Sequence, residues 1–160
     1  MPDEAPWYEV VSIPALLRHA RHTYGTAMRE ALEAAGHDDI PRNGLYVIGG
    51  LALGAGDVPL SVLIRDLRIS KQAAGQLVDA LVERGYLERA QDPGDRRRQV
   101  LALTARGRAA AVAQAAATRR IDARLAERAG ESGPGRLRKL LAALIAIGHE
   151  DDAARDGDNA

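Results

Sequence analysis

Cysteine and phenylalanine are missing from this chain of 160 residues, and tryptophan occurs once. Without a thiol there is no disulfide, no thiolate zinc ligand and no cysteine nucleophile. These absences exclude small disulfide-stapled secreted domains and thiol enzymes, and they suit a reducing cytosol. The apolar fraction of 46% is enough for a hydrophobic core, so we expect one compact domain, or a small domain with appended helices.

Two targeting features are also missing. Residues 1–14 carry Asp3, Glu4 and Glu9 but no basic side chain, whereas a signal peptide begins with a positively charged region. The longest apolar run, residues 45–56, covers about a dozen residues, where a membrane-crossing helix needs roughly 20. We therefore expect a soluble, cytoplasmic protein that is neither exported nor bound to a membrane.

The chain has no excess of either charge, because 22 Lys and Arg balance 22 Asp and Glu. A total of zero argues against a nucleic-acid-binding protein, since such proteins usually carry a basic surplus. Residues 60–108, however, contain ten basic and six acidic side chains, which gives a local charge of +4, and both ends of the chain are acidic. The total therefore hides a basic middle region.

Helical periodicity and breaker residues divide the chain into elements. We expect helices over residues 13–35, 43–53, 61–67, 70–84, 105–129 and 137–147. Two segments of strand character, residues 86–89 and 98–103, flank a Pro-Gly turn and predict a β-hairpin with a charged tip. The predicted fold class is mainly α with a small β-wing.

The helices predicted over residues 61–67 and 70–84 are separated by about three residues. The second has an apolar stripe formed by Ala73, Ala74, Leu77, Val78, Leu81 and Val82. Small and amide side chains on its other face are typical of a recognition helix in the DNA major groove, where Gln pairs with adenine and Lys reaches guanine or phosphate. A pair of helices with a merely solvated polar face is the alternative.

The hairpin tip strengthens the nucleic-acid interpretation. Arg96, Arg97 and Arg98 follow one another on this short loop, where a cation can enter the minor groove. A solvated turn would rarely need three consecutive arginines. Asp95 precedes them and is placed to orient a neighbouring guanidinium group through a bidentate pair.

Three motifs occur in a specific order and spacing: Gly85-Tyr86-Leu87, Asp92-Pro93-Gly94-Asp95-Arg96-Arg97 and Leu103-Thr104-Ala105-Arg106-Gly107. With the helix pair before them, they resemble the winged helix-turn-helix of MarR-type transcriptional regulators. The similarity covers about residues 60–108, and the flanking helices fit in length and position. It implies a bacterial regulator of transcription that is not an enzyme and needs no cofactor.

The resemblance assigns roles to individual residues. Ser70, Lys71, Gln72 and Gln76 match the exposed start of the recognition helix, and Arg97, supported by Asp95, matches the arginine that enters the minor groove. Many members carry a further wing arginine where this chain has Gly94. We therefore expect Arg96 or Arg98 to make that phosphate contact.

The resemblance also implies a homodimer in which two winged domains meet successive major grooves. Its partner would be double-stranded DNA with a pseudo-palindromic operator, whose half-sites lie about 10 bp apart or a multiple of this. The expected organisation is an N-terminal arm (1–11), N-terminal supporting and dimerisation helices (12–58), a winged helix-turn-helix (59–108), C-terminal dimerisation helices (109–148) and a flexible acidic tail (149–160). The alternative is that the apolar stripes of the outer helices cover the core of one chain.

A small aromatic or phenolic effector is the type of ligand that the resemblance implies. Trp7, His19, His22 and Tyr24 are the residues we expect to line its cavity. His19 and His22 also lie three residues apart on one helix face, as a metal pair does, but a metal site needs three or four converging ligands. Two further hypotheses stay open: a winged-helix module that binds another protein, and a metal-responsive regulator of the same fold.

Overall fold

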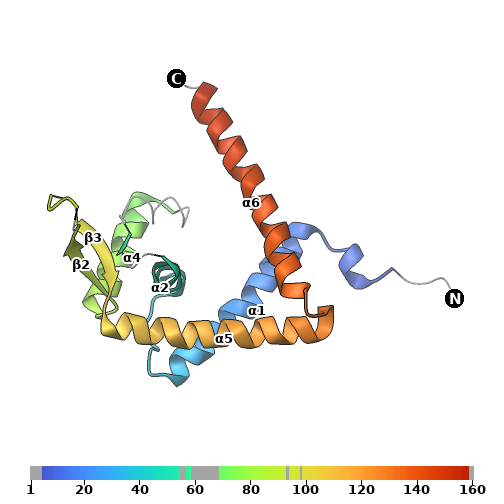
Figure 1. The fold of residues 1–160 in the computed structure, drawn as a ribbon, viewed down its shortest axis with the longest axis horizontal. Helices are drawn as coiled ribbons and strands as arrows, with labels where there is room; N and C mark the ends of the chain where they lie inside the picture. Colours follow the sequence, from blue (N-terminus) through green and yellow to red (C-terminus); the bar gives the residue numbers. More distant parts are fainter. Residues whose placement is uncertain (1–4, 55–56, 59–68, 93, 98, 159–160) are drawn as a thin grey trace. The chain divides into compact units, whose positions relative to one another are not determined.

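The computed structural model describes residues 5–54, 57–58, 69–92, 94–97 and 99–158. The chain divides into two compact units, residues 1–118 and 119–160, which we describe separately. Figure 1 shows the order of the elements along the chain. The predicted helix over residues 61–67 and the residue Arg98 lie outside the described residues.

The first unit begins with a short 3-10 helix, η1 (Trp7–Glu9), followed by α1 (Ile13–Ala34) and α2 (Gly44–Leu53). α1 ends where the sequence predicts, because Gly36 takes a φ of 78°, which side chains with a Cβ rarely adopt. α2 continues through Gly49 and Gly50 and contributes several buried side chains to the core. Burial of α2 therefore outweighs the low helix propensity of its two glycines.

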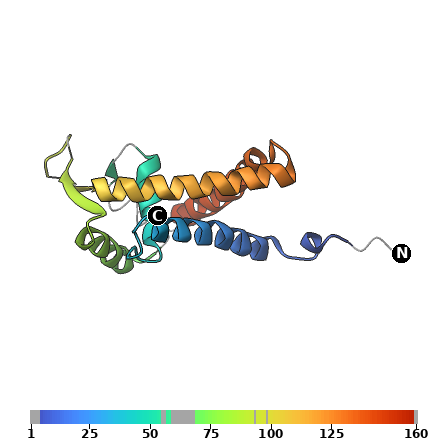
Figure 2. The same ribbon diagram turned by 90° about the horizontal axis from the view of Figure 1, so that it is seen from below.

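α4 (Lys71–Glu83) is followed by the hairpin of β2 (Leu87–Gln91) and β3 (Gln99–Leu103). The hairpin is confirmed: its strands pair antiparallel from Leu87 opposite Leu103 to Gln91 opposite Gln99. It lies at the outer edge of the first unit in both views (Figure 1 and Figure 2). A third strand, β1 (Asp57–Val58), pairs with the other side of β3. β1 was not predicted, because two residues are too few to show the alternation of a strand.

One hydrophobic core joins these elements. Side chains from α1, α2, α4, both hairpin strands and the first part of α5 (Ala105–Ala129) meet in it. The largest fully buried side chains are Tyr86, Leu45, Ile48, Leu51, Leu81, Leu87, Val47 and Val78. The apolar stripe of α4 is narrower than predicted: Ala74, Val78 and Leu81 are buried, whereas Ala73 in the first turn is exposed. Positions i, i+4 and i+7 thus define the inner face of α4.

The second unit contains the end of α5 and the helix α6 (Gly133–Asp158). Gly130, with a φ of 85°, ends α5. α6 is longer than predicted at both ends, and residues 149–158, expected to fray, are helical. That segment has no proline, and Arg155 pairs with Asp152 at 3.5 Å one turn earlier. No helix in the described ranges is long and apolar enough to cross a membrane.

Candidate nucleic-acid interface

The start of α4 is fixed by a side-chain cap. Ser70 has extended backbone angles, and its Oγ accepts a hydrogen bond from the backbone N–H of Ala73 at 3.1 Å. This is the N-cap contact that the sequence predicts for Ser70, and it satisfies one of the free N–H groups at the helix start. Lys71, Gln72 and Gln76 are all exposed beyond the cap. The polar end of α4 is therefore rigidly placed and open to a partner.

The opposite face of α4 anchors it. Ala74, Val78 and Leu81 are each 0% exposed. Burying a Val or Leu side chain stabilises a fold by about 1.5–3 kcal/mol, so this face holds α4 firmly against the core. The helix thus has a buried face that packs against the core and an exposed face whose first turns carry Lys71, Gln72 and Gln76.

Two aspartates shape the tip of the hairpin. Asp92 Oδ1 accepts the backbone N–H of Gly94 at 2.8 Å, and Asp95 Oδ1 accepts that of Arg97 at 3.0 Å. Aspartate commonly bonds the backbone two residues on, because its short side chain reaches that N–H directly. The expected pairing of Asp95 with a guanidinium group is not found among the described residues. Asp95 supports Arg97 through the backbone instead.

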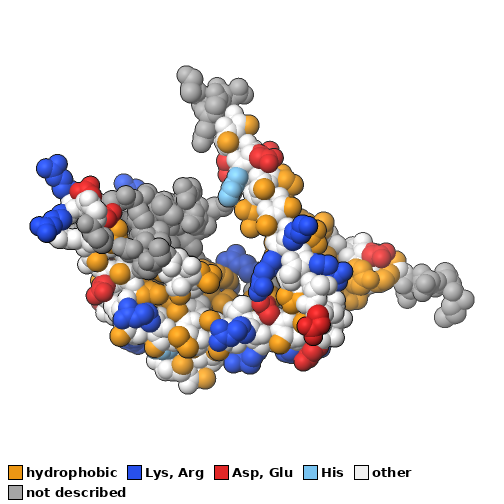
Figure 3. Space-filling view, viewed as in Figure 1, with side chains coloured by type: hydrophobic (Ala, Val, Ile, Leu, Met, Phe, Trp, Pro, Cys, Tyr) orange, Lys and Arg blue, Asp and Glu red, His pale blue; other side chains and the backbone are white. Residues whose placement is uncertain are grey.

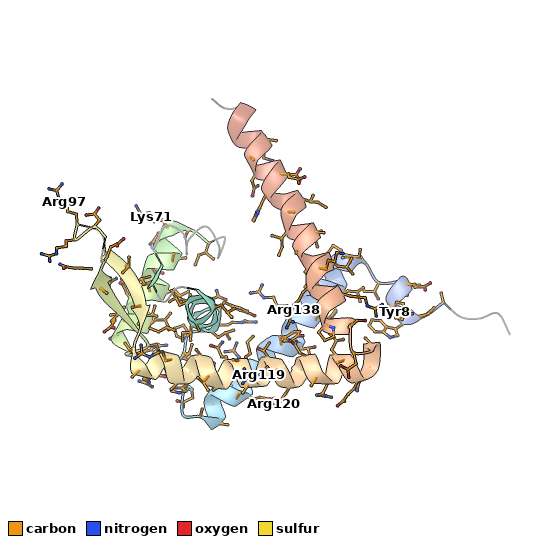
Figure 4. The ribbon with its side chains drawn as sticks, in the orientation of Figure 1. Tyr8, Lys71, Arg97, Arg119, Arg120 and Arg138 are labelled. Carbon is orange, nitrogen blue, oxygen red and sulfur yellow. The ribbon has the colours of Figure 1, made fainter. Side chains whose placement is uncertain are left out.

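The wing arginines project from the surface. Arg96 and Arg97 are both exposed, and Figure 3 shows basic side chains extending at the hairpin beyond its neighbours. In Figure 4, Arg97 at the hairpin and Lys71 at the start of α4 both point away from the core. We call the exposed residues Ser70, Lys71, Gln72, Gln76, Arg96 and Arg97 the helix-and-wing surface.

An ion pair connects the two parts of this surface. Arg89 on β2 donates through Nη2 to Asp79 Oδ1 on α4. Both side chains are largely exposed, and exposed pairs contribute only about 0–1 kcal/mol to stability. The pair therefore links the hairpin to α4 but contributes little to the stability of the fold.

The base of the hairpin is tied to the start of α5. The Thr104 hydroxyl lies 2.6 Å from the Gly85 carbonyl oxygen and 3.2 Å from that of Tyr86, and it accepts the Gly107 backbone N–H at 3.0 Å. A Cβ on Gly107 would lie 2.1 Å from the Tyr86 carbonyl oxygen. Only glycine allows this approach, which explains the Leu-Thr-x-x-Gly motif in physical terms.

A polar network behind the hairpin was not predicted. The Tyr86 hydroxyl donates to Asp39 Oδ1, and Arg106 Nη2 lies 3.1 Å and 3.2 Å from the two Asp39 carboxylate oxygens. The Arg106 guanidinium also lies 4.4 Å from the centre of the Tyr86 ring. Tyr86 and Arg106 belong to the motifs noted above, but Asp39 sits in a loop that carried no sequence signal. The network joins this loop to both ends of the hairpin.

The network shifts the pKa values of Tyr86 and Asp39. Burial, and next its hydrogen bond to Asp39, raise the pKa of Tyr86 to about 12. The hydrogen bond from Tyr86 is also the main cause that lowers the pKa of Asp39, and the charge of Arg106 adds to it. At neutral pH the hydroxyl is therefore protonated and the carboxylate ionised, the states that their hydrogen bond requires.

The four predicted effector residues lie on two elements, η1 and α1. Trp7 is 69% exposed on η1, with its ring 6.0 Å edge-on from Tyr8. His19 and His22 are exposed on α1, and Tyr24 is half-buried there. Of the four, the pocket described next includes only His22. The described residues contain no group of three or more His, Asp or Glu that could hold a metal.

An open pocket of about 800 Å³ lies between α1 and the start of α2. Its described lining residues are Arg18, Arg21, His22, Gly25, Thr26, Arg29, Arg42, Asn43 and Tyr46. We call it the arginine pocket. Most of these residues share one face of α1, and the spacing of Arg18, Arg21, Gly25 and Arg29 is a sequence signal for this one wall of the pocket.

Comparison with known proteins shows which proteins this chain resembles. Residues 38–98 match the model of the MarR family. The chain is similar to RV1404 from Mycobacterium tuberculosis, with 27% identity and a TM-score of 0.63 over 84% of this chain and 90% of that one. A probable transcriptional regulator from Pseudomonas aeruginosa gives 27% identity and a TM-score of 0.58 over 83% and 96%. No curated protein sequence matches the chain.

The structure of reduced MarR from E. coli is also similar, with a TM-score of 0.65 at 20% identity over 85% of this chain and 98% of that one. The class that fold and surface define is the winged helix-turn-helix proteins. Within that class, the resemblance to the MarR family is confirmed, and the fold is that of the MarR-family transcriptional regulators.

Proposed function

We propose that the chain is a homodimeric transcriptional repressor that binds double-stranded DNA at a pseudo-palindromic operator and leaves it when a small effector binds. In this proposal it has no catalytic activity and needs no cofactor. The observation that carries it is the helix-and-wing surface, where the exposed start of α4 and an arginine-bearing hairpin are held by local hydrogen bonds. Such a surface supplies both of the contacts that a winged helix makes with a duplex.

The two parts of the surface suit different grooves. Lys71, Gln72 and Gln76 are donors and acceptors on an exposed helix, which fits the width of the major groove. Arg97 sits on a narrow turn, and a single guanidinium is what the minor groove accepts. Ser70 is already engaged as the helix cap, so we assign it the role of placing α4, with a hydroxyl still free to contact phosphate.

Exposed apolar side chains support a dimer. In the second unit, α6 presents Leu140, Leu144, Ile145 and Ile147 with 45–70% of each side chain's surface accessible. In the first unit, Trp7, Val10 and Ile13 are exposed to a similar degree. Large exposed apolar groups mark interaction surfaces. A dimer with two-fold symmetry would bind an operator with matching two-fold symmetry.

A footprinting experiment tests the proposal. The wild-type chain is titrated onto duplex DNA from upstream of its own gene and of the neighbouring gene, and its mass is measured free and bound. We expect one protected region with two-fold sequence symmetry, occupied by two chains. Arg97→Ala is expected to weaken protection, while Arg124→Ala, an exposed arginine of α5, leaves it unchanged. A folded chain that protects no duplex at low salt would instead favour a module that binds another protein.

A further inference from the structure

The arginine pocket is a basic concave surface with four arginines in its described lining. Arg18, Arg21 and Arg29 come from α1, and Arg42 comes from the segment before α2. His22 lies among them, and the described lining contains no Asp or Glu. None of these four guanidinium groups is paired with a carboxylate in the described part of the chain.

One of the arginines is held in place before any ligand arrives. Arg21 Nε donates to the Tyr46 hydroxyl at 3.2 Å, and its guanidinium lies 4.8 Å from the centre of the Tyr46 ring. Tyr46 is half-buried and packs against the hydrophobic core. Fixing a guanidinium in this way lowers the entropy cost of binding an anion.

The same contact argues against a flat aromatic ligand. Tyr46 is the only Phe, Tyr or Trp side chain in the described lining, and Arg21 already lies over its ring and bonds its hydroxyl. The remaining described lining is guanidinium, imidazole, hydroxyl, amide and glycine. A neutral or singly charged aromatic compound would therefore find little apolar surface, whereas guanidinium forks match the oxygens of phosphate and carboxylate groups.

The number of arginines in the pocket indicates how many negative charges its ligand should carry. Guanidinium groups are ionised at any physiological pH, so four of them in one concave site repel one another. A single negative charge neutralises only part of this repulsion. An oxyanion with two or more negative charges accepts hydrogen bonds from several guanidinium groups at once, and we expect it to bind more tightly for this reason.

We propose that the arginine pocket binds a compact organic oxyanion carrying at least two negative charges, of the phosphate-ester or polycarboxylate type. A volume of about 800 Å³ leaves room for an organic group beside the charged one. The binding itself does not depend on the proposed function. Its use as the signal that releases DNA does rest on the proposed function.

Calorimetry on the full-length chain at constant ionic strength tests the proposal. The probes are pyrophosphate, citrate and, as a monoanionic aromatic control, salicylate. We expect pyrophosphate or citrate to bind at least about 10-fold more tightly than salicylate, because charge-assisted hydrogen bonds add up over several arginines. If only pyrophosphate binds, the ligand is of the phosphate-ester type. If only citrate binds, it is of the polycarboxylate type.

Variants locate the binding. Arg29→Gln and Arg42→Gln are each expected to lower the affinity for the bound probe about 10-fold. Tyr46→Phe, which removes the hydroxyl that holds Arg21, is expected to lower it about 3-fold. Arg124→Gln makes the same charge change outside the lining and is the matched control. Circular dichroism confirms that each variant is folded.

Three results would overturn the proposal: no binding of either multivalent probe, tightest binding of salicylate, or equal weakening by Arg29→Gln and Arg124→Gln. The proposed function fails separately. If pyrophosphate or citrate binds as expected but the chain protects no duplex, the proposed anion site is supported and the proposed function as a DNA-binding repressor is contradicted.

Discussion

The first unit carries two arginine-rich surfaces that differ in shape. The helix-and-wing surface is convex: its arginines sit on a turn held by aspartates, and its lysine begins a capped helix. The arginine pocket is concave, and its arginines line a hollow between two helices. A convex basic surface can reach into a groove of a large polyanion, whereas a concave one encloses a small anion. The same residue type is therefore expected to serve two different ligands.

The largest expected effect comes from breaking the scaffold behind the helix-and-wing surface. Gly107→Ala would place a methyl group 2.1 Å from the Tyr86 carbonyl oxygen, so the base of the hairpin must shift. We expect the free energy of unfolding to fall by about 3 kcal/mol, at the upper end for overpacking, and DNA binding to be lost with it. Urea unfolding measures this.

Gly50→Ala is the control for that variant. Gly50 is exposed in α2, and a Cβ there would meet nothing within 4 Å. We expect it to keep or slightly raise the free energy of unfolding, because alanine favours helix. Equal unfolding energies for Gly107→Ala and Gly50→Ala would contradict the close approach at Gly107.

The next largest effect separates the two surfaces. The double variant Lys71→Ala, Arg97→Ala is expected to weaken duplex binding about 100-fold, since each lost contact costs about 1–3 kcal/mol. Pyrophosphate binding should be unchanged. Arg29→Gln should do the reverse, leaving operator affinity intact in the absence of any small anion. Fluorescence anisotropy and calorimetry measure the two affinities, and a variant that lowers both equally would show that the surfaces are one site.

A smaller effect concerns pH. Between pH 10 and about 12 the folded chain keeps the Tyr86 proton that the unfolded chain loses, because the pKa is raised from 10.0 to about 12. The stability from this group is therefore present below pH 10 and lost as pH rises towards 12. Two pKa units correspond to about 2–3 kcal/mol.

Tyr86→Phe lacks this titration. Wild type should exceed the variant in free energy of unfolding at pH 8, and the difference should shrink as the pH is raised above 10. Tyr8→Phe, which alters an exposed ring of η1, is expected to follow wild type throughout. Parallel pH profiles for wild type and Tyr86→Phe would contradict the role of the Tyr86 hydroxyl.

The smallest effect comes from the wing turn. Asp95→Ala removes the acceptor of the Arg97 backbone N–H but leaves the arginine itself. We expect duplex affinity to fall about 3-fold, because an exposed turn hydrogen bond contributes about 0.5–1.5 kcal/mol. Asp95→Asn keeps an acceptor and should retain most of the affinity. A loss as large as that of Arg97→Ala would mean that Asp95 acts on more than the turn.

The helix-and-wing surface was largely predictable, because its signals are local. Ser70 as a cap, the apolar face of α4 and the Pro-Gly hairpin all depend on residues close together in the chain. The Asp39 network was not, since Asp39 lies 47 positions from Tyr86 and 67 from Arg106. The arginine pocket needs Arg42 to approach α1 across the turn after it, and this too depends on tertiary packing.

The effector prediction shows the same limit. Trp7, His19, His22 and Tyr24 were selected by residue type, and only His22 lines the arginine pocket. Whether the other three contact a ligand stays a prediction, as does the division of the chain at residue 108, through which α5 runs as one helix. A composition-based choice cannot show which side of a helix faces a cavity.

The salt dependence of duplex binding tests the central claim most directly. If Arg97 contacts phosphate or the minor groove, the logarithm of affinity for the operator should fall linearly with the logarithm of salt concentration. Arg97→Ala should make that slope shallower by about one unit, while Arg124→Ala leaves it unchanged. Identical slopes for wild type and Arg97→Ala, with both chains folded and bound, would contradict a wing that meets DNA through this arginine.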